Sequence, residues 1–415
     1  MKSEIRAVRT YLVDTQTGWG VNNLTADKEP VSPGWLEQTL LVNPMSIYPT
    51  FKNTRESWRG PARDAIVVEL ETRDGTVGSA VTYGGGPYAC ALIEDHLSLF
   101  LRGADARDVE RIWDQMYRAS LPYGRRGLGP MAISAVDKAL WDLLGHIYNE
   151  PVYNLIGGRT REVVTVYATG NSLDQTSNYG FPGYKIHLPY GPADGREGLK
   201  ENLARVQAAR EIIGDNVDLM VECYMGWNRE YAVRFAQAAW EYDVRWLEDP
   251  LLPDDLEGYR QIRERVKPIQ IAVGNMEAGR HIFKELIVSG ACDIIQPAVE
   301  WAGGITEVRK IAALAAAFDV PVFPHCDSVY AYHLAMGTPN CVWGEFIFAR
   351  GDGTKLLSSR PAITNEPLPQ NGQVYLREDP GFGVDIDRRA LREWREHFRT
   401  LNNHEQHDAR ECPDE

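Results

Sequence analysis

Side chains that could hold a metal ion or move a proton stand at the ends of several apolar runs. Glu222 ends the run LMVE and Glu248 ends the run RWLE, and later runs end at Asn275, Ala298 and His325. The intervals between these ends are similar, and each suits one helix and two short loops. Two carboxylates and an amide on successive strands are oxygen donors that suit Mg²⁺. A histidine on the opposite wall of the same ring suits general acid–base catalysis.

The elements that must position these side chains form a repeating strand and helix pattern up to about residue 348. Eight runs have strand character: VVTVYATG, YKIHLPY, DLMVECY, VRWLEDP, IQIAVGN, CDIIQPA, VPVFPHC and CVWGEFIF. Eight parallel strands separated by helices predict a (β/α)₈-type barrel, in which the active site lies at the carboxyl ends of the strands. Lys185 and His187 alternate on the second run, so both can face the barrel mouth. Glu345 occupies the corresponding end of the eighth run.

A second, smaller domain is predicted before the barrel, because 415 residues are too many for one ordinary core. Residues 65–83 read as a β-hairpin around Asp74 and Gly75, with turn residues that favour a type I′ connection. Two helical patterns follow and complete an α+β unit over residues 1–127, with the barrel in 128–375. The non-periodic, aromatic-rich stretch through Ser57 favours a packed lid.

Composition limits the partners of the chain. The net charge of −14 argues against a nucleic-acid partner. The sequence shows no secretory signal pattern and no apolar run of about eighteen residues, so we expect a cytoplasmic enzyme that does not span a membrane. The six cysteines form no CxxC pair, which favours reduced cysteines in the core or at strand ends.

Several longer motifs resemble one known family. They are NPMSIY and TRES in the lid, ISAVDKALWDLLG at the first barrel helix, YKIHLPYGPADG, VECYM, RWLEDP, PHCDSVYAYH and EPLPQNGQVYLREDPGFGV. Together they resemble the enolase superfamily, in its mandelate racemase group, and within it the branch of L-rhamnonate dehydratases. The resemblance implies an α+β capping domain over a (β/α)₈-type barrel. It also implies that the C-terminal segment, 376–415, packs back on the capping domain and ends in a frayed tail. Within this segment the stretch ALREWREHFRTL has a helical pattern.

The resemblance assigns roles to the strand-end residues. It implies Mg²⁺ bound by Glu222, Glu248 and Asn275, a catalytic base at His325 and an acid near the substrate at Glu345. It also implies that Arg55, and the neighbourhood of Met45, reach down from the capping domain to the substrate. Our reading of the second strand adds Lys185 as an electrostatic partner of a substrate carboxylate and His187 as a second base. Members of this family commonly form homo-oligomers, from dimers to octamers.

The chemistry implied by the resemblance is the dehydration of a sugar acid. A proton next to a carboxylate is very weakly acidic, so its removal requires a metal ion to stabilise the enediolate and a positioned base. Loss of the β-hydroxyl as water then gives a 2-keto-3-deoxy acid. Two alternatives stay open. One is racemisation or epimerisation of a 2-hydroxy acid by His187 and His325 on opposite faces, and the other is an impaired paralogue with a binding or structural role.

Two metal-ligand positions depart from the usual pattern of this branch. The third ligand is usually Glu and is here Asn275, followed by Met276 where a histidine is expected. An Asn-Met pair resembles the glucarate dehydratases, which makes a neutral amide ligand tolerable but predicts weaker Mg²⁺ binding. Glu222 stands where Asp is usual and is one methylene longer.

The third departure concerns the base. Ala298 stands where the family has the Asp that hydrogen-bonds the catalytic histidine. Without this carboxylate, His325 loses the group that orients it and stabilises its charged form. Glu300 and Asp327 lie close in sequence and are the two candidates to take over that role.

Overall fold

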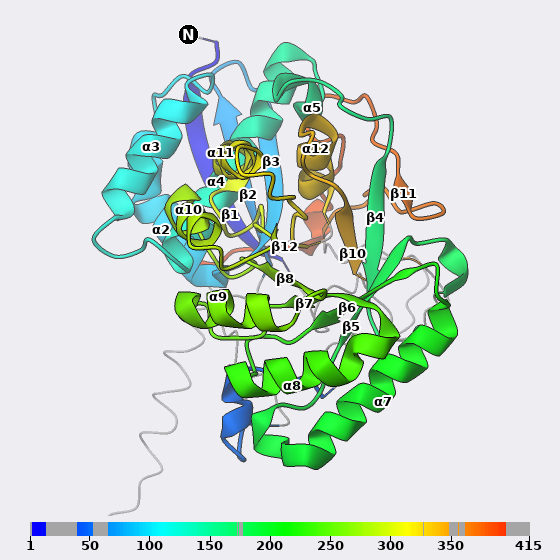
Figure 1. Ribbon diagram of the computed structural model, residues 1–415. Coiled ribbons are helices and arrows are strands. Elements are labelled where there is room, and N and C mark those ends of the chain that lie inside the picture. The colour runs from blue at the N-terminus through cyan, green and yellow to red at the C-terminus, as the bar shows by residue number, and fades with distance from the viewer. Residues whose placement is uncertain are drawn as a thin grey trace, which may run out of the picture.

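The computed structural model describes residues 2–13, 40–52, 65–171, 173, 177–326, 328–347, 356 and 362–395. The larger unit is a curled parallel sheet covered by helices, as predicted (Figure 1). Its strands are β4 (Val164–Thr169), β5 (Gly183–His187), β6 (Asp218–Glu222), β7 (Val244–Glu248), β8 (Gln270–Val273), β9 (Ile294–Ile295) and β10 (Gly344–Ile347). The helices that alternate with these strands are α7 (Gly195–Ile213), α8 (Arg229–Ala239), α9 (Leu256–Arg265), α10 (Arg280–Val288), α11 (Gly304–Ala316) and α12 (Val329–Gly337). Helices α4 (Leu128–Tyr148) and α5 (Val152–Leu155) precede β4, and α4 packs on β2 (Ala65–Thr72) and β3 (Val77–Tyr83) of the smaller sheet.

The sheet runs in the order β10-β4-β5-β6-β7-β8-β9, so neighbours in sequence are neighbours in space. The seventh predicted run, 320–326, forms only isolated parallel bridges in the described chain. Val322 bridges Ile295 of β9 and also Cys341, which precedes β10, and His325 bridges Ala298. Pro321 and Pro324 explain this, because proline has no N–H to donate to a ladder. A short strand, β11 (Gln373–Val374), pairs antiparallel with β4.

The inside of the barrel has an apolar floor below the polar strand ends. Because side chains alternate along a strand, the residue two places before a strand-end polar group points to the same interior, as Met220 does before Glu222 and Trp246 before Glu248. The interior residues pack on one another as one buried cluster: Tyr167, Met220, Trp246, Ala272, Ile294 and Phe323. Helices α7, α8 and α9 pack side by side on the outside of the sheet, and α9 contacts β8 (Figure 1). The floor closes the barrel from below, so the polar ends can be approached from one side.

The smaller unit is an antiparallel sheet with two helices. Strands β1 (Ile5–Val13), β2 (Ala65–Thr72), β3 (Val77–Tyr83) and β12 (Leu391–Arg392) pair in the order β12-β1-β2-β3, and α2 (Gly86–Asp95) and α3 (Val109–Ser120) pack beside it. The hairpin is confirmed, but its type I′ turn is wrong. The connection spans four residues, and among them Gly75 has a positive φ whereas Asp74 does not. A type I′ turn needs positive φ at both central residues.

The C-terminal segment returns to this unit. Leu391 and Arg392 pair with Val13 and Leu12 of β1, so the start of the stretch ALREWREHFRTL is a strand and not the helix that its pattern predicts. Edge pairing with an existing sheet overrides the local helical pattern here. Residues 396–415 lie outside the described chain. Among the described helices, none is both long and apolar enough to cross a membrane.

The described part of the lid lies over the loops that follow β5 and β6. The backbone N–H of Val42 donates to the carbonyl of Leu188 at 3.1 Å. A Cβ at Gly226 would lie 2.4 Å from the Val42 side chain, so this close approach requires glycine. The 3₁₀ helix η1 (Pro44–Ile47) follows and contains Met45. The lid prediction is thus consistent with residues 40–47, while Arg55 lies outside the described residues.

A buried ion pair joins the two units. Lys138 of α4 donates to the carbonyl of Val81 in β3 at 3.1 Å, lies 4.4 Å over the ring of Tyr330 and is 3.8 Å from a carboxylate oxygen of Glu300. Both charged side chains are almost fully buried. The lysine therefore connects the capping sheet to the loop after β9.

Replacing Lys138 by methionine is expected to lower the free energy of unfolding by about 3–5 kcal/mol, because Glu300 keeps a buried charge without this cation. The double variant Lys138→Met/Glu300→Gln should recover much of that loss. Urea unfolding of the three proteins measures both effects. If the single and double variants lost the same free energy of unfolding, the uncompensated charge of Glu300 would not be the cause of the loss.

Candidate active site

The strand register places three of the predicted residues in one row. His187 of β5 pairs with Glu222 of β6, and Glu222 pairs with Glu248 of β7. All three side chains are buried at the carboxyl ends of their strands. The predicted strand-end positions are therefore brought together by the barrel.

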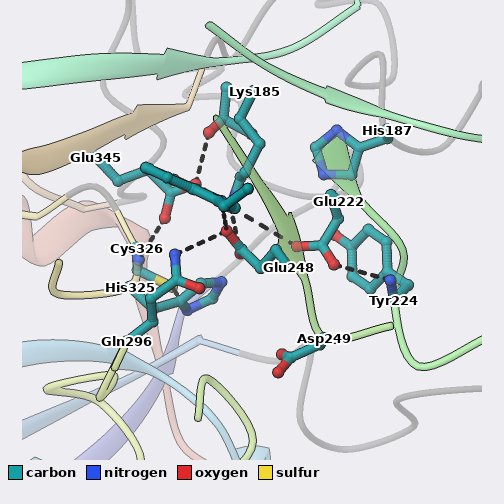
Figure 2. Close-up of polar contacts among 12 residues, drawn as sticks. Lys185, His187, Glu222, Tyr224, Glu248, Asp249, Gln296, His325, Cys326 and Glu345 are labelled. Atoms are coloured by element: carbon teal, nitrogen blue, oxygen red, sulfur yellow. Dashed lines mark hydrogen bonds and ion pairs between the residues drawn. The ribbon is translucent and has the colours of Figure 1, made fainter. Parts of the chain in front are cut away.

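Lys185 is the centre of the site (Figure 2). Its ammonium nitrogen lies 2.5 Å from Oε1 of Glu248, 2.9 Å from Oε1 of Glu345 and 3.7 Å from Oε2 of Glu222. The lysine is 1% exposed, so the four charges interact away from bulk water. One cation thus faces three carboxylates, and this group retains a net negative charge.

The pKa shifts follow from this imbalance. Burial opposes the charge on Lys185, but Glu248 and Glu345 raise its pKa well above the ordinary value. Burial also acts against ionised Glu345, yet Lys185 and neighbouring groups lower the pKa of that carboxyl to about 2. For Glu222, burial and the charge of Glu248 together raise the pKa well above the usual range. Among the three carboxyl groups, Glu222 is therefore the one without enough positive charge nearby to compensate its ionised form.

Fixed donors orient the other two carboxylates. Glu248 accepts hydrogen bonds from Trp246 Nε1 at 3.2 Å and from Gln296 Nε2 at 2.7 Å. Glu345 accepts from the Thr169 hydroxyl at 2.6 Å and from the backbone N–H of Cys326 at 2.8 Å. The carboxylates are thus held in place before any ligand binds.

The next strand end supplies a neutral oxygen donor. Asn275 is 1% exposed, and its Oδ1 has no hydrogen-bond partner among the described residues. Oδ2 of Asp249 is likewise buried without a described partner, and burial and Glu248 raise the pKa of this carboxyl. Buried oxygens of this kind are normally satisfied by a hydrogen bond, so they point to a bound group.

Within the described chain, no three His, Cys, Asp or Glu side chains form a metal site by themselves. A set of Glu222, Glu248 and the amide of Asn275 fits Mg²⁺ by charge and donor type.

The two histidines flank this cluster. Figure 2 shows His187 beside Glu222 and Tyr224, and His325 on the other side beside Cys326. His187 stacks on the Tyr224 ring with centroids 5.2 Å apart, and His325 lies 6.0 Å from the ring of Trp301. His325 is 8% exposed. Their placement suits proton transfer on opposite sides of a bound substrate, and the assigned roles stay predictions.

Of the two candidates to replace the missing carboxylate beside His325, the structure describes one, Glu300. Ala298 bridges His325 across adjacent strands, so residue 298 does lie beside the histidine. Glu300 lies 3.8 Å from Lys138, and its proposed role at His325 stays a prediction. Asp327 lies outside the described residues. Nδ1 of His325 is 3.0 Å from the sulfur of Cys326.

Sequence reasoning missed several residues that hold the site. These are Thr169, Trp246, Asp249, Gln296 and the sulfur of Cys326. The alternation of side chains could have found Trp246 and Gln296, since each lies two positions before a strand-end candidate, Glu248 and Ala298. Thr169 contacts Glu345 across the closed ring, and Cys326 contacts the adjacent His325 through a left-handed backbone conformation. No local sequence pattern reports either contact. The structure shows Lys185 in contact with three protein carboxylates. Its contact with a substrate carboxylate stays a prediction.

Comparison with known proteins identifies the family. An enolase C-terminal domain-like family matches residues 170–390, and the mandelate racemase/muconate lactonizing enzyme N-terminal domain matches residues 59–157. L-rhamnonate dehydratase of Saccharopolyspora erythraea is 42% identical over 92% of this chain and 97% of that enzyme. The structure of rhamnonate dehydratase from Gibberella zeae complexed with Mg is 38% identical, with a TM-score of 0.88 over 95% of this chain and 98% of that one.

A less similar structure matches over a similar length. A racemase from Streptomyces coelicolor with bound magnesium is 29% identical, with a TM-score of 0.72 over 94% of this chain and 100% of that one. The resemblance read from the motifs is confirmed over nearly the full length. The chain therefore belongs to the mandelate racemase/muconate lactonizing enzyme family of the enolase superfamily, as a full-length homologue of L-rhamnonate dehydratases.

Proposed function

We propose that this protein is a Mg²⁺-dependent dehydratase that converts a sugar acid, L-rhamnonate or a similar aldonate, into its 2-keto-3-deoxy acid. The observation that carries the proposal is the similarity to an L-rhamnonate dehydratase over the whole chain. The reaction class is that of a hydro-lyase. The buried carboxylates, the amide and the two histidines are the groups that such a reaction requires.

The metal would be held by Glu222, Glu248 and the amide oxygen of Asn275. When bound, Mg²⁺ supplies positive charge where the substrate carboxylate gains electrons as the neighbouring proton is lost. The raised pKa of Glu222 and the buried Oδ1 of Asn275 support this ligand set, because both groups lack a partner of sufficient positive charge.

The protein side chains perform the proton transfers. His325 accepts the proton next to the carboxylate, and its charged form can then protonate the leaving β-hydroxyl. His187 is the second candidate acid, from the opposite side. Lys185 keeps Glu248 and Glu345 ionised, as the lowered pKa values of both carboxyls indicate despite burial. Arg55 and Glu345 are proposed to contact the substrate carboxylate or hydroxyls.

The proposal is tested with the purified protein, Mg²⁺ and a panel of aldonates that includes L-rhamnonate. Proton NMR should show loss of the signal at C2 and a new C3 methylene in the keto acid. A chelator should stop the reaction. No product from any aldonate, combined with no binding of Mg²⁺ in calorimetry, would instead indicate an impaired paralogue.

A racemase or epimerase of a 2-hydroxy acid is the second candidate. It is favoured by the placement of His187 and His325 on opposite sides of the carboxylate cluster (Figure 2). Exchange of the C2 proton with deuterium, with inversion and without a keto acid, would support it over dehydration.

The amide of Asn275 gives a direct test of the metal set. Asn275→Leu keeps a similar volume and removes the oxygen, so Mg²⁺ affinity should fall by at least about tenfold. Asn275→Asp adds a negative charge and should increase the affinity. Titration calorimetry of the chelator-treated protein measures both. Unchanged affinity in the leucine variant would exclude Asn275 as a ligand.

The proposal extends to a cytoplasmic homo-oligomer, between a dimer and an octamer, as the family resemblance implies. Analytical ultracentrifugation of the purified protein and fractionation of the source cells test these two points.

A further inference from the structure

The catalytic histidine of this chain has an unusual neighbour. Residue 298 forms a parallel β-bridge with His325. It is a fully buried alanine and offers no hydrogen-bonding side chain. A general base nevertheless needs a defined orientation and a defined tautomer. The group found beside its Nδ1 is the sulfur of Cys326, at 3.0 Å.

The position of this sulfur is fixed by the backbone. Cys326 has φ of 73°, the left-handed region that a residue with a Cβ enters at a cost of about 1–2 kcal/mol. Its N–H donates to Oε2 of Glu345 at 2.8 Å. Glu345 is in turn held by Lys185 at 2.9 Å and by Thr169 at 2.6 Å. The anchored carboxylate therefore keeps Cys326 in a conformation that directs its thiol to the imidazole.

We propose that Cys326 is the positioning residue of His325 and takes the orienting role of the absent carboxylate. This inference rests on the proposed function, in which His325 moves the proton. A thiol can accept a hydrogen bond from Nδ1–H, which leaves the lone pair on Nε2 for the substrate proton. Once Nε2 has taken that proton, the charged imidazole still carries Nδ1–H, and Nε2–H can be given to the departing hydroxyl. The sulfur therefore accepts the same hydrogen bond in both protonation states that one turnover requires.

The burial of both residues supports a fixed pair. Cys326 is 5% exposed and His325 8%, and Cys326 forms no disulfide. Trp301, with its ring 6.0 Å from that of His325, donates from Nε1 to the carbonyl of Tyr83. The imidazole therefore has an anchored indole and an anchored thiol as neighbours, and the thiol lies at its Nδ1.

Cys326→Gly is the informative variant, because glycine adopts a positive φ without strain. If Cys326 had only a structural role, this change would leave the stability of the fold unchanged or increase it. We expect kcat to fall by about 10²-fold with little change in KM, less than the roughly 10⁴-fold loss when a catalytic triad loses its carboxylate. Cys326→Ser keeps a hydroxyl at the site and should retain most of kcat. In the background Cys326→Gly, Ala298→Asp should restore part of the activity, since residue 298 bridges His325.

A second measurement is independent of turnover. Nitrogen NMR of the imidazole groups reports which ring nitrogen carries hydrogen, and the signals of His325 are those lost in His325→Asn. The wild type and Cys326→Ser should share one tautomer preference, and Cys326→Gly should change it. Unchanged imidazole signals in the glycine variant would overturn the proposal, as would unchanged kcat. A loss of kcat in Glu300→Gln but not in Cys326→Gly would assign the role to Glu300. If the wild type dehydrates no aldonate, the proposed dehydratase function is wrong. The NMR comparison still decides whether the thiol positions His325.

Discussion

Replacing His325 by asparagine is expected to lower kcat for dehydration by about 10²–10⁴-fold, the usual contribution of a positioned acid or base. Asparagine keeps much of the shape of the imidazole but cannot accept the substrate proton. The measurement is the initial rate of keto acid formation from the aldonate that the wild type accepts. A circular dichroism spectrum like that of the wild type would show that the fold is retained.

His187→Asn is the matched comparison. If His325 serves as both base and acid, His187→Asn should retain exchange of the C2 proton with deuterium, and His325→Asn should lose it. If the protein is a racemase, each variant should lose exchange for one of the two enantiomers. Full dehydration by His325→Asn would contradict the assignment of the base.

The strand ends could be predicted because they depend on short-range pattern alone. A parallel barrel with regular register must place residues such as His187, Glu222 and Glu248 in one row, and it does. The sequence pattern gave a wrong secondary structure where a tertiary contact or a proline outweighed the local preference. Residues 391–392 form an edge strand on β1 instead of a helix, and the two prolines reduce the seventh run to bridges.

The contacts inside the site could not be predicted from the sequence. Lys185 and Glu345 are 160 positions apart, and their 2.9 Å contact exists because the barrel closes β10 onto β4. The contact of Cys326 with His325 depends on a left-handed backbone conformation that sequence favours for glycine and not for cysteine. Closure and backbone conformation are properties of the whole fold, so strand-by-strand reasoning finds the residues but not their partners.

Lys185→Met should be the most destabilising single change in the site. It leaves Glu248 and Glu345 buried without the lysine that lies 2.5 Å and 2.9 Å from them. Removing one partner of a buried pair costs about 3–5 kcal/mol. We expect a loss of this size in the free energy of unfolding at pH 8, measured in urea with a chelator present, so that no added metal replaces the missing charge.

The pH dependence separates charge from packing. In the wild type, the pKa values of Glu248 and Glu345 lie below their unfolded values, so their stabilising effect is present above the unfolded pKa and is lost as the pH falls through the folded pKa. Without Lys185, burial should raise both values, and the stability of the variant should then fall as the pH rises through them. The difference between wild type and variant should therefore be larger at pH 8 than at pH 5. The control Lys185→Met/Glu345→Gln removes one of the uncompensated charges and should recover stability at pH 8. A loss that is the same at both pH values, and that the control does not reduce, would show that Lys185 acts through packing and not through its charge.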